Sequence, residues 1–247
     1  AGAKKALNFA ISNDPDISDV ARIRLADLHI ELEEYGQALT VLSAVQASAF
    51  MRVEDVDYQK GSTANNRNVY FAVTGRGPGA GTYNDWGTVY KLELDENKPL
   101  EGQLTQIISG NTNSNNADGN LSQLQSPDNI CVTENFVYFQ EDPNSFSRGH
   151  SAYIYQSDLN GNNIQEVLEF VVRQDLAPNG STGLSGEYGA LIDISDKVGE
   201  PGTFILNLQP HYWKDDSFKG RDGHTFTDGT YEDNQGGQIV LLQGLPR

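Results

Sequence analysis

The spacing of hydrophobic residues changes character near residue 50. Before that point, apolar residues alternate with charged ones at a roughly helical spacing over residues 16–45; they include Val20, Ile23, Leu28, Ile30 and Leu32. Asp16 or Ser18 stands where an N-cap is expected, and Gly36 marks a turn between two helices. The pattern therefore predicts a short α-helical hairpin over residues 1–46.

After residue 50 the apolar runs become short and alternating, with Gly- and Asn-rich turns between them. This pattern is typical of β-strands joined by turns. The predicted strands are residues 51–58, 68–73, 87–94, 104–109, 126–133, 136–141, 151–159, 186–195, 202–208 and 237–242. Residues 162–172 fit a helix or a strand equally well.

The strands repeat along the chain. The runs that begin at Val69, Val137 and Thr203 follow one another after 68 and 66 residues, and each has a strand before it and another after it. A near-constant period of this length indicates blades. The prediction is a mainly β fold, a partial β-propeller of about three blades over residues 50–247, preceded by the helical segment 1–46. Because propellers close with about four to eight blades, further chain segments or a protein partner would complete the ring.

Polar residues recur at matching points of the three units. Glu54 and Asp55, Asp128 and Asn129, and Glu187 stand near the unit starts, and Thr74, Glu141 and Gln209 follow the central strands. In a propeller these positions meet at one mouth of the central channel, where carboxylates can bind a metal. Ordinary surface turns also carry acids, so both interpretations stay open.

The composition of the chain narrows the kinds of partner that the protein is expected to bind. The chain has 34 acidic and 17 basic residues, and its formal net charge of −17 makes nucleic acid an unlikely partner, because phosphates need a basic surface. An acidic chain binds cations or simply stays soluble, and solvated surface accounts for most of its carboxylates. The single cysteine, Cys131, cannot form an internal disulfide, and no apolar run is long enough to span a membrane.

The helical segment resembles a tetratricopeptide-type hairpin. The resemblance covers little more than one repeat and is carried by Ala21, Leu25, Ala26, Tyr35, Gly36, Ala38 and Leu39. One repeat cannot bury its own apolar face and needs neighbours. An ordinary amphipathic hairpin docked on another element remains the alternative.

Residues 50–247 resemble the PhoX-type alkaline phosphatases and related secreted propellers. The resemblance is carried by the motifs "RVEDVDY", "NVYFAVTG", "WGTVYKLELD", "SPDNICVTENFVYFQED", "GEYGALIDIS", "GTFILNLQPH" and "DNQGGQIVLL" in this order. It implies a multi-bladed propeller with a calcium and iron cluster in its channel. It also implies phosphate monoester hydrolysis and a periplasmic or extracellular location, although this chain contains no signal peptide.

The resemblance also implies metal ligands. Glu54, Glu141 and Glu187 correspond to cluster carboxylates, while Asp55 and Asp142 correspond to calcium or outer carboxylates. Carboxylates that converge from different blades suit hard cations. The cysteine that binds iron in the family is not found, because Cys131 lies in an apolar strand and is expected in the core. His211, just beyond a central strand, is a weak candidate for substrate binding.

Two functions follow from these observations. The first is part of a metal-dependent phosphatase that acts on a phosphate ester, with enzymatic activity of this chain uncertain because earlier blades and the iron-binding cysteine are not in it. The alternative is a non-catalytic propeller that binds a partner or forms an extracellular assembly. No H-x-x-x-H pair, complete P-loop or G-x-S-x-G motif offers another chemistry.

Overall fold

The computed structural model describes residues 52–75, 86–98, 100–110, 119–143, 148–171, 186–210, 213–218 and 236–247. The chain divides into two compact units, Ala1–Ala49 and Phe50–Arg247. All described residues belong to the second unit. The predicted helical hairpin and His211 lie outside them.

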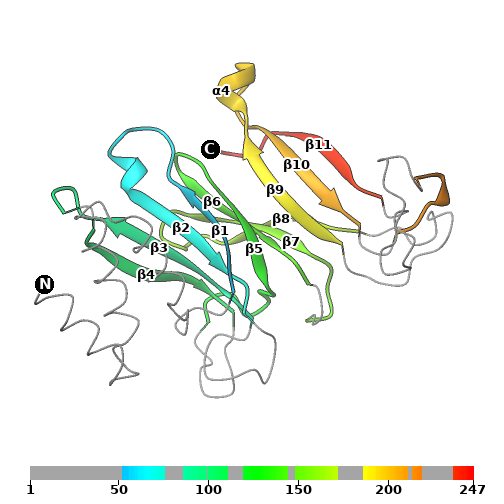
Figure 1. Ribbon diagram of the computed structural model, residues 1–247, viewed down its shortest axis with the longest axis horizontal. Helices are drawn as coiled ribbons and strands as arrows, with labels where there is room; N and C mark the ends of the chain where they lie inside the picture. The colour runs from blue at the N-terminus through cyan, green and yellow to red at the C-terminus, as the bar shows by residue number, and fades with distance from the viewer. Residues whose placement is uncertain are drawn as a thin grey trace, which may run out of the picture. The chain divides into compact units, whose positions relative to one another are not determined.

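The described part of the second unit contains three antiparallel sheets (Figure 1). The first sheet comprises β1 (Val53–Tyr58), β2 (Asn68–Val73), β3 (Thr88–Leu94) and β4 (Gly102–Ser109). The second comprises β5 (Pro127–Val132), β6 (Phe136–Glu141), β7 (Tyr153–Asp158) and β8 (Gln165–Glu169). The third comprises β9 (Glu187–Asp193), β10 (Thr203–Gln209) and β11 (Gln238–Gln243).

The mainly β class is therefore confirmed for the described residues, and the ten predicted strands lie where the alternating runs placed them. β4 begins two residues before its predicted start, at Gly102. The ambiguous run 162–172 contains a strand, β8, which pairs with β7. Helical structure in this part of the chain is limited to α4 (Ser195–Val198) and two short 3₁₀ turns, η1 (Asn65–Arg67) and η3 (Asp216–Phe218).

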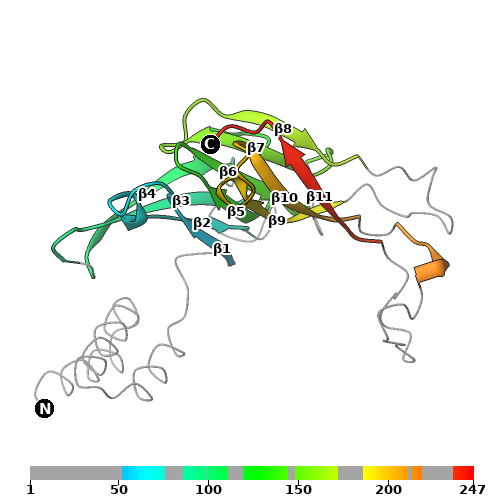
Figure 2. The same cartoon turned by 90° about the horizontal axis from the view of Figure 1, so that it is seen from above.

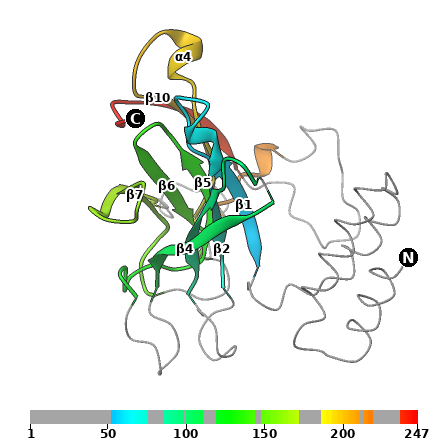
Figure 3. The same cartoon turned by 90° about the vertical axis from the view of Figure 1, so that its left-hand side faces the viewer.

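Within each sheet the strands pair in chain order, so each connection joins neighbouring strands. The second sheet packs between the other two (Figures 1 and 2). The first strands of the sheets lie side by side: β1 packs beside β5, and β5 packs beside β9. The short helix α4 follows β9 and projects at one end of the third sheet (Figure 3).

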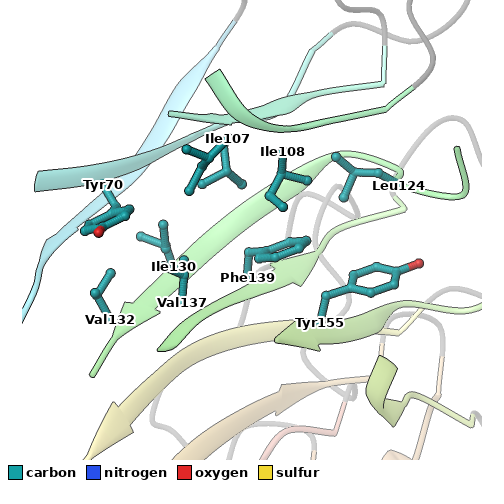
Figure 4. Packing of buried hydrophobic residues seen from close by; sticks show 10 residues of the cluster. Tyr70, Ile107, Ile108, Leu124, Ile130, Val132, Val137, Phe139 and Tyr155 are labelled. Carbon is teal, nitrogen blue, oxygen red and sulfur yellow. The ribbon is translucent and has the colours of Figure 1, made fainter. Parts of the chain in front are cut away.

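Two apolar layers hold the sheets together. Figure 4 shows the layer between the first and second sheets, in which Tyr70, Ile107 and Ile108 pack toward Val137 and Phe139. The layer between the second and third sheets contains Tyr138, Ile154, Tyr188, Phe204 and Leu206. Each fully buried side chain of this size contributes about 1.5–3 kcal/mol. Burial of these two layers therefore stabilises the packing between the sheets.

These layers correct the repeat in its third unit. Val137 and Phe139 of β6 face the preceding sheet, while Tyr138 faces the following one. In β10 the side chains that face the preceding sheet are Phe204 and Leu206. Because side chains alternate along a strand, Phe204 and not Thr203 is equivalent to Val137. The third unit is therefore offset by one residue from the alignment expected from the sequence.

Side chains of β1 replace backbone pairing between the first two sheets. Asp55 and Asp57 accept hydrogen bonds from the backbone N–H groups of Ile130 (3.0 Å) and Val132 (2.8 Å) on β5. A buried N–H group at a strand edge needs an acceptor, and alternate residues of β1 supply it. None of the described helices is long and apolar enough to cross a membrane.

Candidate cation site

The polar residues of the three units meet at one end of the sheets. In each antiparallel pair, the start of the first strand lies opposite the end of the second: Val53 opposite Val73, Pro127 opposite Glu141, and Glu187 opposite Gln209. Residues that flank these pairs therefore gather at the end remote from α4. This end is called the acidic end below.

Three carboxylates converge at the acidic end: Asp128 from the start of β5, Asp142 from just after β6, and Glu187 from the start of β9. One ligand oxygen from each lies within 4.8 Å of the others. Asp142 is buried, whereas Asp128 and Glu187 are half-buried. Asp142 and Glu187 were expected in a metal site. Asp128 was noted only as a repeated polar position and was not among the expected ligands.

Asp128 is held in place by neutral groups. The Thr74 hydroxyl donates to the Pro127 carbonyl oxygen at 3.1 Å and lies 3.3 Å from Asp128 Oδ1. The Asn129 side-chain amide donates to Asp128 Oδ2 and to the Tyr188 carbonyl oxygen, both at 3.1 Å. Asn129 thereby links the second and third sheets directly beside the carboxylates.

The electrostatic environment disfavours negative charge on Asp128. Burial raises the pKa of Asp128 to about 6, and the negative charges of Glu54 and Glu187 add to that rise. The Thr74 hydrogen bond and the charge of Arg52 act in the opposite direction but more weakly. A cation among the three carboxylates would remove this repulsion.

A close backbone contact with Ser126 fixes the chain at Asp142. The backbone N–H of Asp142 donates to the Ser126 carbonyl oxygen at 2.9 Å. Ser126 has a positive φ of 47°, which few non-glycine residues adopt, and its buried hydroxyl has no hydrogen-bond partner in the structure. Gly87 packs closely against Pro127, the residue that follows Ser126. A Cβ at Gly87 would lie 2.2 Å from Pro127 Cδ.

Glu141 precedes Asp142 but lies elsewhere. Its side chain is fully buried, and its oxygens accept hydrogen bonds from the backbone N–H groups of Gln125 (2.8 Å) and Tyr153 (3.0 Å). His150 Nδ1 lies 3.7 Å from Glu141 Oε2. Burial raises the pKa of Glu141 to about 8, and the hydrogen bonds from Tyr153 and Gln125 partly oppose this rise. The structure does not bring Glu141 into the group of three carboxylates.

The two remaining expected ligands also differ in position. Glu54 forms an ion pair with Arg52 (2.9 Å) at the acidic end, and its charge acts on Asp128. The Asp55 carboxylate is used by the backbone of Val56 and Ile130. The structure therefore gives Asp55 a role in joining sheets. Cys131 is buried in the layer between the second and third sheets, and burial raises its pKa to about 12.

A second group of acids lies at the other end of the first strands, in a pocket of about 510 Å³ beside α4. Basic residues form ion pairs with these acids. Arg247 contacts Asp193 at 2.7 Å and Asp196 at 2.9 Å, and Lys60 pairs with Asp57. At the acidic end, Glu54 pairs with Arg52 at 2.9 Å. The convergence of three carboxylates makes the acidic end the better candidate for a cation.

The sequence comparisons give one match. Residues 1–76 match a family described as a tetratricopeptide repeat-like domain. This covers less than a third of the chain and extends over β1 and β2, which are strands, so it does not define the family of the whole protein. No curated protein and no solved structure matches the chain.

Proposed function

We propose that residues 50–247 form part of a PhoX-like β-propeller that binds calcium at Asp128, Asp142 and Glu187. The observation that carries this proposal is the convergence of one oxygen from each carboxylate within 4.8 Å of the others. The three residues come from two sheets, as expected for a site at a channel mouth. Propeller closure and calcium binding both go beyond the three antiparallel sheets themselves.

Calcium fits the donor set. It takes six to eight oxygen ligands in a flexible geometry, including carboxylates, carbonyl oxygens and waters. Three carboxylates supply part of that set. Burial, together with the negative charges of Glu54 and Glu187, raises the pKa of Asp128 to about 6. The proposed periplasmic or extracellular location agrees with a calcium site, since extracellular modules bind calcium at about 10⁻⁴–10⁻³ M.

Iron fits less well than calcium. The resemblance implies a thiolate ligand, but Cys131 is the only cysteine of the chain and lies in the layer between two sheets. Its raised pKa also disfavours the thiolate form that binds metals. We therefore assign no iron-binding role to the residues described.

Phosphate monoester hydrolysis is the activity that we propose for the complete propeller. Bound calcium would supply electrostatic stabilisation of phosphoryl oxygens. The residues of this chain would hold that cation and keep it at the mouth of the channel. The alternative is a non-catalytic propeller that uses calcium only to join its sheets. A calcium ion bound by Asp142 and Glu187 would join the second sheet to the third, which favours this role for the chain by itself.

Calcium titration tests the site. At free calcium 100 times the Kd, binding should stabilise the protein by about 2.7 kcal/mol, which raises Tm by roughly 5–10 °C for a domain of this size. Asp142→Asn and Glu187→Gln should each remove most of this shift. Glu96→Gln is the matched control, because Glu96 is an exposed acid paired with Arg67 and should leave the shift unchanged.

Hydrolysis of p-nitrophenyl phosphate, with and without EDTA, separates the two functions. Calcium-dependent hydrolysis that Glu187→Gln abolishes would support the phosphatase. Calcium binding without hydrolysis would favour the non-catalytic alternative. A protein whose Tm and calorimetric titration show no response to millimolar calcium would overturn the site itself.

A further inference from the structure

One fully buried side chain of the second sheet has polar atoms without a partner. Gln140 is inaccessible to solvent, and neither its amide oxygen nor its amide nitrogen has a hydrogen-bond partner in the structure. A buried amide without hydrogen bonds is costly, because it has lost its contacts with water and gained none in return. Such a group in a folded protein indicates that something else binds there, an ion or a water.

Gln140 lies between the apolar layer and the acidic end. Phe139 faces the first sheet and Tyr138 the third, so Gln140, one residue after Phe139, faces the third sheet. Asp142 lies on the same side, since its carboxylate is close to that of Glu187 in the third sheet. Residues two apart on a strand are only about 6.5–7 Å apart, from twice the rise per residue. The Gln140 side chain is therefore a neighbour of the Asp142 carboxylate.

The residue opposite Gln140 also leads to the carboxylates. Gln140 of β6 is paired with Asn129 of β5, and the side chains of paired residues start about 4.5–5.5 Å apart on the same face. The Asn129 amide donates to Asp128 Oδ2 at 3.1 Å. Gln140 thus has Asp142 beside it along its strand, and across the sheet it has a residue that contacts Asp128.

A second unpartnered group lies on the other side of Asp142. The Ser126 carbonyl oxygen accepts a hydrogen bond from the Asp142 N–H group, and the buried Ser126 hydroxyl has no partner. Among the described residues, four have buried side-chain polar atoms without a partner, and two of these four are neighbours of Asp142. The other two are Tyr155, on the opposite face of the second sheet, and Thr203, at the start of β10. Unmet hydrogen-bonding capacity therefore occurs where the three carboxylates converge.

We propose that the Gln140 amide oxygen is a fourth protein ligand of the calcium ion bound by the three carboxylates, and that it makes the site select calcium over magnesium. The inference rests on the proposed function, because it concerns the same cation. Amide oxygens are ordinary ligands of calcium, which takes six to eight oxygens. Magnesium keeps several waters and binds through one or two carboxylates, so a buried amide oxygen adds little to its binding.

A neutral fourth ligand suits the charge of the site. The three carboxylates carry up to three negative charges, which already exceed the two positive charges of calcium. Burial and the charges of Glu54 and Glu187 raise the pKa of Asp128 in the calcium-free site. A fourth carboxylate would add to this repulsion, whereas an amide oxygen adds a ligand without adding charge.

Gln140→Met tests the ligand in the full chain. Methionine is unbranched and fills similar space, but it offers no oxygen. The calcium Kd from calorimetric titration should rise about tenfold or more, at least the effect of losing an outer partner of a metal ligand. The magnesium Kd should change less, so the preference for calcium over magnesium should fall about tenfold.

Europium(III), a luminescent substitute for calcium, reports ligation directly. The difference between its luminescence lifetimes in H₂O and in D₂O gives the number of waters bound to the ion. In Gln140→Met this number should rise by about one, because a water takes the place of the amide oxygen. Loss of a side chain that acted only through packing would leave the number unchanged.

In EDTA the same variant should have the opposite effect on stability. Removal of a buried amide without a partner should raise the Tm of the calcium-free protein by about 2–4 °C or more. Gln140→Glu keeps an oxygen at this position, so it should keep the europium hydration of the unaltered protein and bind calcium at least as tightly. Its added buried charge should lower Tm in EDTA.

Gln156→Met is the matched control. Gln156 is a buried glutamine on the same face of the second sheet, opposite Tyr138 and one row further from the acidic end. Its replacement should leave the calcium Kd, the preference over magnesium and the europium hydration unchanged.

The outcomes separate this inference from the cation site itself. Unchanged calcium affinity and europium hydration in Gln140→Met, with calcium still bound by the unaltered protein, would overturn the inference and leave the site standing. No calcium binding by the unaltered protein would overturn both. If Gln140→Met does not fold, Gln140→Asn gives the same test, because it withdraws the amide oxygen by one carbon.

Discussion

Glu141 and Asp142 are consecutive acids at the end of β6, and their surroundings differ in kind. The Glu141 side chain is fully buried and receives hydrogen bonds from the backbone N–H groups of Gln125 and Tyr153. Asp142 is nearly as buried, yet its carboxylate lies with those of Asp128 and Glu187. Glu141 thus accepts hydrogen bonds from two backbone N–H groups, whereas Asp142 lies in a group of three carboxylates.

Strand geometry produces the difference. Successive side chains of a strand point to opposite faces, so Glu141 shares the face of Val137 and Phe139, which lies toward the first sheet. Asp142, just after β6, has an oxygen within 4.8 Å of one of Glu187 in the third sheet. Donors that saturate a carboxylate leave little capacity to bind a cation, whereas clustered carboxylates are destabilised until a cation binds. Two acids that look equivalent in sequence therefore have separate roles, one in folding and the other in the candidate site.

The largest expected effect is the loss of stability in a Glu141 variant, which tests this comparison directly. Glu141→Ala should lower the free energy of unfolding by about 3 kcal/mol, because two buried N–H groups lose their acceptor. Asp142→Ala, measured in EDTA, should change it by less than about 1 kcal/mol, since removing a like charge offsets lost contacts. Urea unfolding measures both. Equal losses would contradict the separation of roles.

The joining acids of β1 give the next effect. Asp55→Ala should cost about 1–2 kcal/mol, because the Ile130 N–H group loses its acceptor at the contact between the first two sheets. Asp57→Ala should act similarly through the Val132 N–H group. Hydrogen exchange at Ile130 and Val132 should accelerate in the matching variant only. Unchanged protection at both amides would show that these carboxylates do not hold β1 to β5.

Calcium affinity should depend on pH through Asp128. Its pKa of about 6 in the folded protein lies above the ordinary 3.8, so the proton competes with calcium below about pH 6. Affinity should fall about tenfold from pH 7 to pH 5 for one such group. Without calcium the sign is opposite: the folded state holds this proton more tightly than the unfolded chain, so stability decreases as pH rises from about 4 to 6. Asp128→Asn should remove both dependences, and a calcium affinity that is flat between pH 5 and pH 7 in the unaltered protein would rule out Asp128 as a ligand.

The sequence predicted the strands well because their signal is local. Alternating runs such as "NVYFAV" and "FVYFQE" specify strands by themselves, and the repeat placed polar residues at one end of the sheets. The offset in β10 was missed because Phe204 and Thr203 both fit the pattern, and only packing shows which one faces the second sheet.

The site was predicted less completely, for a different reason. Asp142 and Glu187, two of the predicted ligands, lie with a third acid, Asp128, which the resemblance did not include. It also grouped Glu141 with them, since the sequence does not show which acids find backbone donors. The available signal for Asp128 was its place among the polar residues that recur near the starts of the three units. Donors such as Tyr153 N–H, 12 residues from Glu141, depend on sheet pairing that no local pattern specifies.

The smallest effect concerns Glu54, the acid that lies near the site but not in it. Its ion pair with Arg52 is partly exposed, with a third of the Glu54 side chain accessible, and such pairs contribute about 0–1 kcal/mol. Glu54→Gln should therefore change stability by less than about 0.5 kcal/mol. Its charge does act on Asp128, so the variant should lower the pKa of Asp128 slightly and shift the pH midpoint of calcium binding downward. Calorimetric titration at several pH values measures that shift. Loss of calcium binding as complete as in Asp142→Asn would instead make Glu54 a direct ligand, and would extend the site from the second and third sheets to the first.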